Sequence, residues 1–500
     1  MCDSLLGGIL SSICLFYNQT ECSRVQWTPP LRESFGYPIF AIQMTIITYF
    51  LKYKTNKKIW ILYIGVPTTM FFLVWQFASF ALTTQIAALF ILFSFDYINE
   101  KMALTLIYAY MGAFAAAFIL LFGNEMLLTS FFFAGLITFF TILKFHQIFR
   151  RITYNLIYVI ASCVVFVSGT MGLKILFSRA LHVEDDAHIF QLIRAKFTNY
   201  SNFHTRLYTC AKEFDFLGYE TVETTMETLL LPTAGLVFFL LAIVFFRKEL
   251  PRLFKKRETP RNSLPAEIFY NTIQCVFFGI LAILIMRLKL FFVPHLCITA
   301  SIIANSKIIN EALSIRISSK FRRAVTVALI AMMSFKGISN LQNQWNIMGE
   351  FNNPEQEMLL NWIIRNTEPN CVFAGPMPFM ASVKLSTNRA IVNHPHYEDV
   401  GLRNRTMKVY AMFSRKPLAE VYGSLKDMGV NYFLHHAGSC SKPTKSECGY
   451  RSIWDLEDPA NINRPSNCDI LNDVLYQEKT NEISPFQIVY MTYEYLILKL

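Results

Sequence analysis

The sequence predicts a polytopic α-helical membrane protein with about eleven transmembrane helices, followed by a C-terminal α/β domain outside the bilayer. Hydrophobic residues make up 53% of the 500 residues and charged residues only 16%, whereas about 25% of residues are charged in soluble domains. Apolar stretches that approach the ~20 residues needed to cross a bilayer recur along the first two thirds of the chain. After about Lys336 the sequence becomes mixed and polar. We therefore predict a multi-pass transmembrane domain over residues 1–336 and a soluble α/β domain over residues 337–500.

Each apolar stretch is separated from the next by a polar loop, so each is expected to form one transmembrane helix. The stretches are Leu5–Phe16, Tyr37–Leu51, Ile59–Trp75, Phe77–Phe95, Met102–Phe122, Met126–Leu143, Tyr154–Phe177, Thr233–Phe246, Ile268–Met286, Phe291–Ala304 and Ala324–Phe335. The first is short, and a signal peptide is its alternative interpretation. That alternative fits poorly, because no basic residue precedes the apolar stretch.

The orientation follows from the distribution of positive charge between the loops. Four loops are rich in Lys and Arg: Lys52–Lys58, Lys144–Arg151, Arg247–Arg261 and Lys307–Arg323. Loops 17–37 and 178–232, on the other side, hold at least as many acidic as basic residues. Because basic loops stay in the cytosol, the second side and the C-terminal domain are predicted to be luminal. Three N-x-S/T sequons, which begin at Asn18, Asn199 and Asn404, all fall on this side and are predicted glycosylation sites.

The eleven cysteines contain no C-x-x-C pair, so the sequence predicts no zinc site. Six of them lie in polar segments that the orientation places in an oxidising compartment. The predicted disulfide joins Cys440 to Cys448, with Cys468 as a competing partner. The net charge of +11 does not indicate nucleic-acid binding, because the basic residues lie in short loops that flank apolar stretches. They indicate contact with membrane lipid instead.

The last third of the sequence alternates between helical and strand patterns. Asn353-Pro354 is typical of the start of a helix, and Lys416-Pro417 begins a second amphipathic helix. Cys371–Ala374, Arg389–Asn393 and Val430–Leu434 are predicted strands, and a strand-like run extends from Phe486 to Leu498. This alternation predicts a small α/β domain.

The segment Glu21–Ser34, which reads E-C-S-R-V-Q-W-T-P-P-L-R-E-S, contains two arginines beside a tryptophan and two prolines. One interpretation is an anchor at the membrane interface, where Trp and Arg are common. The other is a site for a lipid phosphate, because a guanidinium group binds phosphate oxygens in a bidentate manner. The residues alone leave both interpretations open.

This segment closely resembles the dumpy-nineteen-like family of protein C-mannosyltransferases, which belong to the GT-C membrane glycosyltransferases. Four other motifs carry the same resemblance: D-D-A-H-I-F at 185–190, N-F-H-T-R-L-Y-T-C at 202–210, I-V-N-H-P-H-Y-E-D at 391–399 and I-W-D-L-E-D-P-A-N at 453–461. V-F-A-G at 372–375 and S-R-K-P at 414–417 match as well. The resemblance runs from about residue 6 to the C-terminus and implies a GT-C-like fold.

The resemblance also implies an activity. Members of the family transfer mannose from dolichyl-phosphate mannose to the indole C2 of tryptophan in W-x-x-W segments, in the lumen of the endoplasmic reticulum. The implied partners are the dolichol-linked lipid donor and tryptophan-containing secretory or membrane polypeptides, and no cofactor is required. The implied location is the endoplasmic reticulum membrane, with the nuclear envelope as a second one.

Candidate site residues follow from the matched motifs. Arg32, then Arg24, is predicted to bind the donor phosphate, and Glu33 either shares that site or orients Arg32. Asp185, Asp186, His188 and His204 are assigned to the donor and sugar pocket, although each histidine could instead be structural. The acceptor side is assigned to His394, His396, Glu398, Asp399 and Trp454, with a structural role as the alternative for the two histidines. No metal site is predicted, because an arginine can neutralise a lipid phosphate.

One departure from the family pattern affects the catalytic prediction. In the family, two helices and a long luminal loop precede the region that this sequence matches, and the catalytic acid is expected in that loop. No residue here is carried over as the catalytic acid, which is expected upstream of Met1. A non-catalytic membrane scaffold is therefore the alternative function. A transporter is disfavoured, because the two halves show no internal symmetry.

Overall fold

The computed structural model describes residues 1–23, 32–55, 57–149, 152–181, 191, 194–198, 200–256, 264–347, 353–395, 397, 399–443, 445–477 and 479–500. The chain divides into two compact units. Unit 1 comprises Met1–Val183 and Asp215–Glu350, and unit 2 comprises Glu184–Phe214 and Phe351–Leu500.

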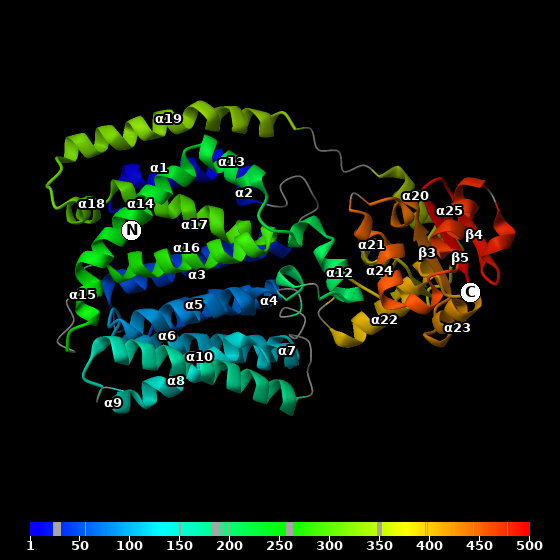
Figure 1. Ribbon diagram of the computed structural model, residues 1–500, viewed down its shortest axis with the longest axis horizontal. Coiled ribbons are helices and arrows are strands. Elements are labelled where there is room, and N and C mark those ends of the chain that lie inside the picture. Colours follow the sequence, from blue (N-terminus) through cyan, green and yellow to red (C-terminus); the bar gives the residue numbers. More distant parts are fainter. Residues whose placement is uncertain are drawn as a thin grey trace. The chain divides into compact units, whose positions relative to one another are not determined.

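Unit 1 is a bundle of apolar helices that run side by side in roughly the same direction (Figure 1). Among the described residues, seven helical segments are long and apolar enough to cross a membrane. They are α3 (Arg32–Tyr53), α6 (Glu100–Leu120), α10 (Asn155–Ala180), α14 with its continuation (Leu230–Leu253), α16 (Ala266–Leu284), the segment Met286–Ala304 that contains α17 (Lys289–Ser301), and α19 (Ser319–Trp345). Four shorter apolar helices are α1 (Leu5–Tyr17), α4 (Trp60–Val74), α5 (Ala78–Ser94) and α8 (Phe131–Lys144). Every predicted apolar stretch falls on one of these helices, which confirms the polytopic helical fold.

The remaining helices of unit 1 are short. They are α2 (Gln19–Cys22), α7 (Glu125–Leu128), α9 (His146–Phe149), α13 (Tyr219–Glu227) and α18 (Ser306–Leu313). The long helix that begins as α14 (Leu230–Val244) passes through a π-helical turn, Phe245–Glu249, into α15 (Leu250–Leu253). The turn Met286–Leu288 between α16 and α17 is a 3₁₀ helix.

A buried polar network joins α3, α4, α5 and α6 inside unit 1. The side-chain amides of Gln43 and Gln85 donate to each other's oxygens at 2.9 and 2.8 Å. Tyr110 Oη donates to Gln85 Oε1 at 2.7 Å, and Gln43 Nε2 also reaches Thr68 Oγ1 at 3.2 Å. Lipid offers such groups no hydrogen-bond partner, so pairing across helices removes the cost of burying them. The network therefore fixes how these four helices pack.

The ion pairs at the helix ends join predicted luminal residues to one another and predicted cytosolic residues to one another. Glu33 pairs with Arg287, and Glu21 with Lys289, at the end of the bundle where α3 begins. Lys52 pairs with Asp3, and Lys248 with Glu311, at the end where α3 finishes. We call these the Arg32 end and the Lys52 end of unit 1.

Unit 2 is built on a five-stranded mixed sheet with the order β2-β1-β3-β5-β4 (Figure 1). The strands are β1 (Val372–Ala374), β2 (Ala390–Ile391), β3 (Tyr432–His436), β4 (Gln487–Met491) and β5 (Tyr495–Lys499). Strands β2, β1 and β3 are parallel, and β5 pairs antiparallel with both β3 and β4. The helices of this unit are α12 (Phe203–Thr209), α20 (Pro354–Asn366), α21 (Met377–Thr387), α22 (Val400–Tyr410), α23 (Leu418–Asp427), α24 (Tyr450–Glu457) and α25 (Asn467–Gln477).

The helix starts and the first three strands of unit 2 lie where the sequence predicts them. The Asn353 side chain accepts a hydrogen bond from the Gln356 amide at 3.1 Å, with Pro354 in the first turn of α20. The run from Phe486 to Leu498 differs from the prediction, because it is a hairpin of two strands. Thr492 N donates to Tyr495 O at 2.8 Å and closes the turn. Alternating apolar residues on both strands conceal this turn in the sequence.

Two unit boundaries differ from the predicted ones. Helix α19 continues beyond residue 336, because its polar last turns pack on α1: Asn340 Nδ2 donates to Tyr17 O at 3.2 Å, and a Cβ atom at Gly337 would overlap the Tyr17 ring. The predicted luminal loop 178–232 is also divided, since Glu184–Phe214 belongs to unit 2. A disulfide between Cys210 and Cys448 attaches that segment to unit 2.

Candidate functional site

A group of charged side chains lies at the Arg32 end of unit 1. Arg32 is the first residue of α3, and its side chain is exposed. Its neighbour Glu33 is 4% exposed and forms an ion pair with Arg287 in the turn between α16 and α17. Glu33 therefore does orient an arginine, but the described partner is Arg287 rather than Arg32. A buried carboxylate that holds a partly exposed guanidinium fixes the direction in which that guanidinium points.

A second ion pair repeats this arrangement. Lys289 Nζ lies 2.9 Å from Glu21 Oε2, and Glu21 is buried in the short helix α2. Arg287 and Lys289 are two residues apart, so one turn of chain presents two cations, each held by a buried carboxylate from a different helix. We define Glu21, Arg32, Glu33, Arg287 and Lys289 as the Arg32-end cluster. Its exposed cationic atoms suit the binding of a phosphate group.

The sequence analysis missed Arg287 and Lys289. The signal that could have found them is their position, because two cations lie in a short turn on the side that the other loops leave poor in positive charge. Such a turn departs from the usual charge distribution of membrane proteins, and a departure of this kind indicates a specific role.

Several predicted site residues lie outside the described residues. They are Arg24 of the predicted phosphate site, Asp185, Asp186 and His188 of the predicted sugar pocket, Asn199, and His396 and Glu398 of the predicted acceptor side. Their roles stay predictions.

His204 lies in unit 2 and contacts the loop that the sequence assigns to the acceptor side. Its Nδ1 atom lies 2.6 Å from Tyr397 Oη, and the two rings meet edge to face. Burial, and then the positive charge of Arg403, lower the pKa of His204 to about 4. Burial also raises the pKa of Tyr397. At neutral pH the histidine is therefore neutral and shares one hydrogen bond between its Nδ1 atom and the Tyr397 hydroxyl. The structure thus places His204 beside Tyr397, next to the segment that the sequence assigns to the acceptor side, and the other predicted donor-pocket residues lie outside the described residues.

The other described acceptor-side residues have different surroundings. Asp399 is exposed, and its carboxylate accepts a hydrogen bond from Leu402 N at 2.6 Å, which caps α22. His394 is half-buried. Trp454 is 4% exposed, with its ring centroid 5.1 Å from that of Phe203. The assignment of Trp454 as an acceptor contact is therefore wrong, because the side chain packs in the core of unit 2.

The whole chain, residues 1–500, matches the family model Dpy19, described as Q-cell neuroblast polarisation. The chain belongs to the Dpy19 family. It is 45% identical to the C-mannosyltransferase dpy-19 of Caenorhabditis briggsae, over 100% of this chain and 72% of that relative. It is 42% identical to the human protein C-mannosyl-transferase DPY19L1, over 94% of this chain and 69% of that relative. Because relatives of this similarity are named as C-mannosyltransferases, the chain is a glycosyltransferase of that kind.

Solved structures support the same fold. The archaeal oligosaccharyltransferase AglB from Archaeoglobus fulgidus, solved in complex with an inhibitory peptide and a dolichol-phosphate, matches with a TM-score of 0.53 and 12% sequence identity. The match covers 90% of this chain and 59% of that chain. At this identity the likeness concerns the fold alone, and it identifies the Dpy19-family chain as GT-C-like, as the sequence predicts.

Two of the motifs that carry the family resemblance meet in unit 2. Arg415, in S-R-K-P, forms a bidentate pair with Asp455, in I-W-D: Nε to Oδ1 is 2.6 Å and Nη2 to Oδ2 is 3.2 Å. Arg415 Nη1 also donates to Arg464 O at 2.5 Å, and Asn467 N donates to Ser414 O at 2.9 Å. Bidentate pairing gives geometric specificity as well as energy. These contacts connect the start of α23 to α24 and α25, so this part of the family pattern is structural.

The predicted disulfide between Cys440 and Cys448 is wrong. The structure joins Cys440 to Cys468, the competing partner, and Cys448 to Cys210. The two disulfides span 28 and 238 residues of sequence. The prediction paired Cys440 with Cys448 because they are only eight residues apart in sequence. In the fold, the end of α12 brings Cys210 to Cys448, and α25 brings Cys468 to Cys440.

The predicted glycosylation sites Asn18 and Asn404 differ in how deeply the asparagine side chain is buried. Asn18 is 1% exposed; its Nδ2 donates to Cys14 O at 2.9 Å, and its Oδ1 accepts from Thr228 Oγ1 at 2.7 Å. A glycan there would break both hydrogen bonds and has no space, so Asn18 is not a glycosylation site of the folded chain. Asn404 is exposed on α22 and stays a predicted site.

Metal binding finds no support in the part of the chain that the structure describes: no three His, Cys, Asp or Glu side chains gather there in a way that could hold an ion. The acidic pair Asp185-Asp186 lies outside that part. The expectation of no metal site therefore stays a prediction.

Proposed function

We propose that this Dpy19-family chain transfers mannose from dolichyl-phosphate mannose to the indole C2 of tryptophan in W-x-x-W segments, in the lumen of the endoplasmic reticulum. The observation that carries the proposal is the Arg32-end cluster, in which two buried carboxylates each hold a cation at one end of a bundle of membrane helices. A lipid-linked phosphate lies at this depth of a bilayer, where its headgroup meets the helix ends.

The reaction exchanges one bond for another. The bond between the mannose C1 atom and the donor phosphate oxygen breaks, and dolichyl phosphate leaves with an additional negative charge. A carbon–carbon bond forms between C1 and the indole C2, and the C2 proton is then lost to a base. Arg32, Arg287 and Lys289 supply positive charge where the phosphate charge develops, which is the most effective place for electrostatic stabilisation.

The two carboxylates of the cluster act as positioning residues in this proposal. Glu21 and Glu33 are buried beside Lys289 and Arg287, so their negative charges are already neutralised by those cations. A preformed array costs no reorganisation as the donor phosphate develops charge. Neither carboxylate is assigned as the base that takes the indole proton.

Unit 2 is proposed to bind the acceptor polypeptide. Three sequence motifs of the family, at 202–210, 391–399 and 453–461, lie together in it. His204 and Tyr397 join the first two motifs, and Phe203 and Trp454 join the first and third. Of these groups, the half-buried and neutral His204 is suited to contact an indole-bearing peptide, whereas Phe203 and Trp454 pack in the core and hold the motifs together.

The test is transfer by the purified protein in lipid vesicles. The chain is incubated with dolichyl-phosphate mannose and a W-x-x-W peptide, and the peptide is sequenced by mass spectrometry. One hexose attached through carbon to a tryptophan supports the proposal. A peptide with both tryptophans replaced by phenylalanine serves as the control. Absence of hexose, from protein whose cooperative unfolding shows that it is folded, would overturn the proposal.

A further inference from the structure

A polar cavity of about 540 Å³ lies at the Lys52 end of unit 1, the end opposite the Arg32-end cluster. Its volume falls within the range of about 300–1,000 Å³ that is typical of small-molecule sites. The cavity is formed by the chain before α1, the end of α3, the turn between α5 and α6, the start of α16 and the start of α18. The charged and hydrogen-bonding side chains that line it include Asp3, Lys52, Lys54, Asp96, Tyr97, Glu267 and Lys307.

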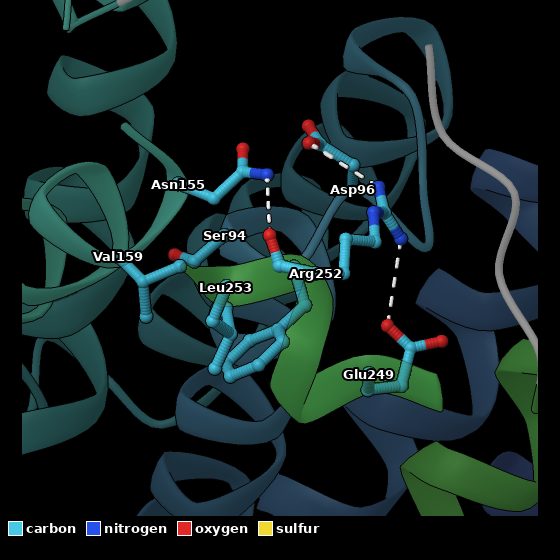
Figure 2. A pocket seen from close by; sticks show the side chains of 8 residues that line it. Ser94, Asp96, Asn155, Val159, Glu249, Arg252 and Leu253 are labelled. Atoms are coloured by element: carbon cyan, nitrogen blue, oxygen red, sulfur yellow. Dashed lines mark hydrogen bonds and ion pairs between the residues drawn. The ribbon is translucent and has the colours of Figure 1, made fainter. Parts of the chain in front are cut away.

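Two of the three acidic side chains in the lining have cationic partners. Asp3 pairs with Lys52, and both side chains are partly exposed. Asp96 lies 4.0 Å from Arg252, which also pairs with Glu249 at 3.4 Å. Figure 2 shows the Arg252 guanidinium between the two carboxylates, with Asn155 donating to the Arg252 carbonyl. The charge of Asp96 is therefore already compensated from outside the cavity.

The third acid, Glu267, is different. It is 8% exposed, in the first turn of α16, and its carboxylate has no hydrogen bond or ion pair among the described residues. Beside it in the lining is Tyr97, which is 2% exposed; its hydroxyl faces the Glu249 carboxylate but forms no hydrogen bond of normal geometry with a described residue. A buried carboxylate and a buried hydroxyl without partners are each costly. Such groups in a native structure require an explanation, and a bound ligand is one.

Two cations of the lining are also without partners. Lys54 and Lys307 are exposed and form no ion pair among the described residues. The lining thus combines an unsatisfied buried acceptor pair, Glu267 and Tyr97, with two available ammonium groups nearer the solvent. A ligand that satisfies both sets carries a hydrogen-bond-donating cation at one end and an anion next to it.

We propose that this cavity binds the headgroup of an aminophospholipid, with phosphatidylethanolamine as the simplest case. The primary ammonium donates to Glu267 and Tyr97, and the phosphate pairs with Lys54 and Lys307. A choline headgroup has no N–H group and cannot make the first set of hydrogen bonds. A lipid is favoured over a soluble ester because α3, α6 and α16 become apolar directly from the cavity, which places it at headgroup level.

The test measures headgroup preference. The purified chain in detergent is titrated with 1-palmitoyl-2-oleoyl phosphatidylethanolamine and with the matching phosphatidylcholine, and bound lipid is counted by native mass spectrometry. We expect a roughly tenfold preference for the ethanolamine lipid, the size of one hydrogen bond to a charged group. Glu267→Gln should reduce that preference to near unity. The double variant Lys54→Ala, Lys307→Ala should weaken the binding of both lipids equally. Lys57→Ala, in the same loop, and Glu100→Gln are the matched controls.

A second measurement distinguishes a ligand-binding carboxylate from a structural one. Without lipid, Glu267→Gln should raise the unfolding temperature, because it removes a largely buried charge that accepts no hydrogen bond among the described residues. Equal retention of the two lipids by the natural protein, or an unchanged preference in Glu267→Gln, would overturn the proposal. If soluble phosphoethanolamine binds as tightly as the lipid, the ligand of the cavity is a soluble phosphate ester, and the proposal of a membrane lipid is wrong.

Discussion

Unit 1 and unit 2 bury ionisable side chains in different ways. At the Arg32 end of unit 1, Glu21 and Glu33 are buried as parts of ion pairs with Lys289 and Arg287. In unit 2, His435 is fully buried in strand β3, and neither of its ring nitrogens has a hydrogen-bond partner among the described residues. Burial lowers the pKa of His435 to about 3. The Arg32 end of unit 1 therefore keeps buried charges and neutralises them with partners, whereas strand β3 of unit 2 keeps a buried base uncharged.

This difference predicts how each unit responds to change. A paired charge is sensitive to the loss of its partner, because the remaining charge stays in a medium that solvates it poorly. A neutral buried base is sensitive to protons instead. Mutations at the ion pairs should therefore affect unit 1 most, and acid should affect unit 2 most.

The largest effect is expected from Arg287→Ala. It removes a cation from the proposed phosphate site and leaves Glu33 buried without that partner. We expect a roughly 100-fold loss of mannosyl transfer, as for removal of a transition-state donor, and a loss of stability of about 1–3 kcal/mol, as for a buried acceptor that loses one partner. Turnover and thermal unfolding are measured together, with Arg287→Lys expected to recover part of both. The exposed Arg323→Ala on α19 is the control, and equal behaviour of the two alanine variants would remove Arg287 from the site.

Arg32→Ala should have a smaller but more specific effect. The side chain is exposed, so its removal leaves no buried charge and the unfolding temperature should not change. Turnover should fall roughly tenfold or more, because one charge-stabilising group is lost. Steady-state kinetics with the W-x-x-W peptide would check this. Unchanged turnover would mean that Arg32 is only an interfacial anchor.

Acid is expected to destabilise unit 2. His204 and His435 have pKa values of about 4 and about 3 in the folded chain, below the ordinary value of 6.5. Their contribution to stability is complete above pH 6.5 and is lost as the pH falls from there toward 4, because the unfolded chain takes up protons first. For His435 the loss at pH 5 is on the order of 2 kcal/mol.

The measurement is thermal unfolding between pH 7.5 and about 5, monitored by hydrogen exchange of β3 and β5. His435→Leu should flatten the pH dependence without removing it, since His204 still contributes. A variant with the same slope as the natural protein would show that His435 is not the group that responds.

The smallest effect concerns glycosylation. If the Arg32 end and unit 2 both face the lumen, Asn404 should carry an N-linked glycan and Asn18 none, since only Asn404 is exposed. Asn404→Gln should remove one glycan, seen as a mobility shift after glycosidase treatment, with little change in stability. Asn18→Gln should leave the glycan pattern unchanged. A glycan on Asn18 would contradict the described fold at α1 and α2.

The apolar helices and most of the α/β domain could be predicted from the sequence, because both depend on local patterns. Lipid requires long apolar runs, and the start of α20 is set by Asn353 and Pro354 themselves. The relation between distant segments could not be predicted. The pairing of Cys448 with Cys210 depends on the position of α12, and the pairing of Glu33 with Arg287 joins residues 254 positions apart.

The candidate site was predicted less well for the same physical reason. Sequence similarity identified Arg32 and Glu33, but the partner of Glu33 is fixed by helix packing. His204 was identified through the family motif at 202–210. Its contact with Tyr397, however, joins residues 193 positions apart, which no local motif shows. Residues that act through such contacts leave no local pattern in a single sequence.

The division of unit 2 between two stretches of sequence also constrains how the protein is made. Cys210 is synthesised 238 residues before Cys448, and the interior strand β5 is later still. The segment around α12 therefore has no native disulfide partner until the last membrane helices and Cys448 have been synthesised. During that interval Cys210 can pair only with cysteines that precede Cys448 in the chain, so the native fold of unit 2 requires its thiol to remain available until Cys448 is made.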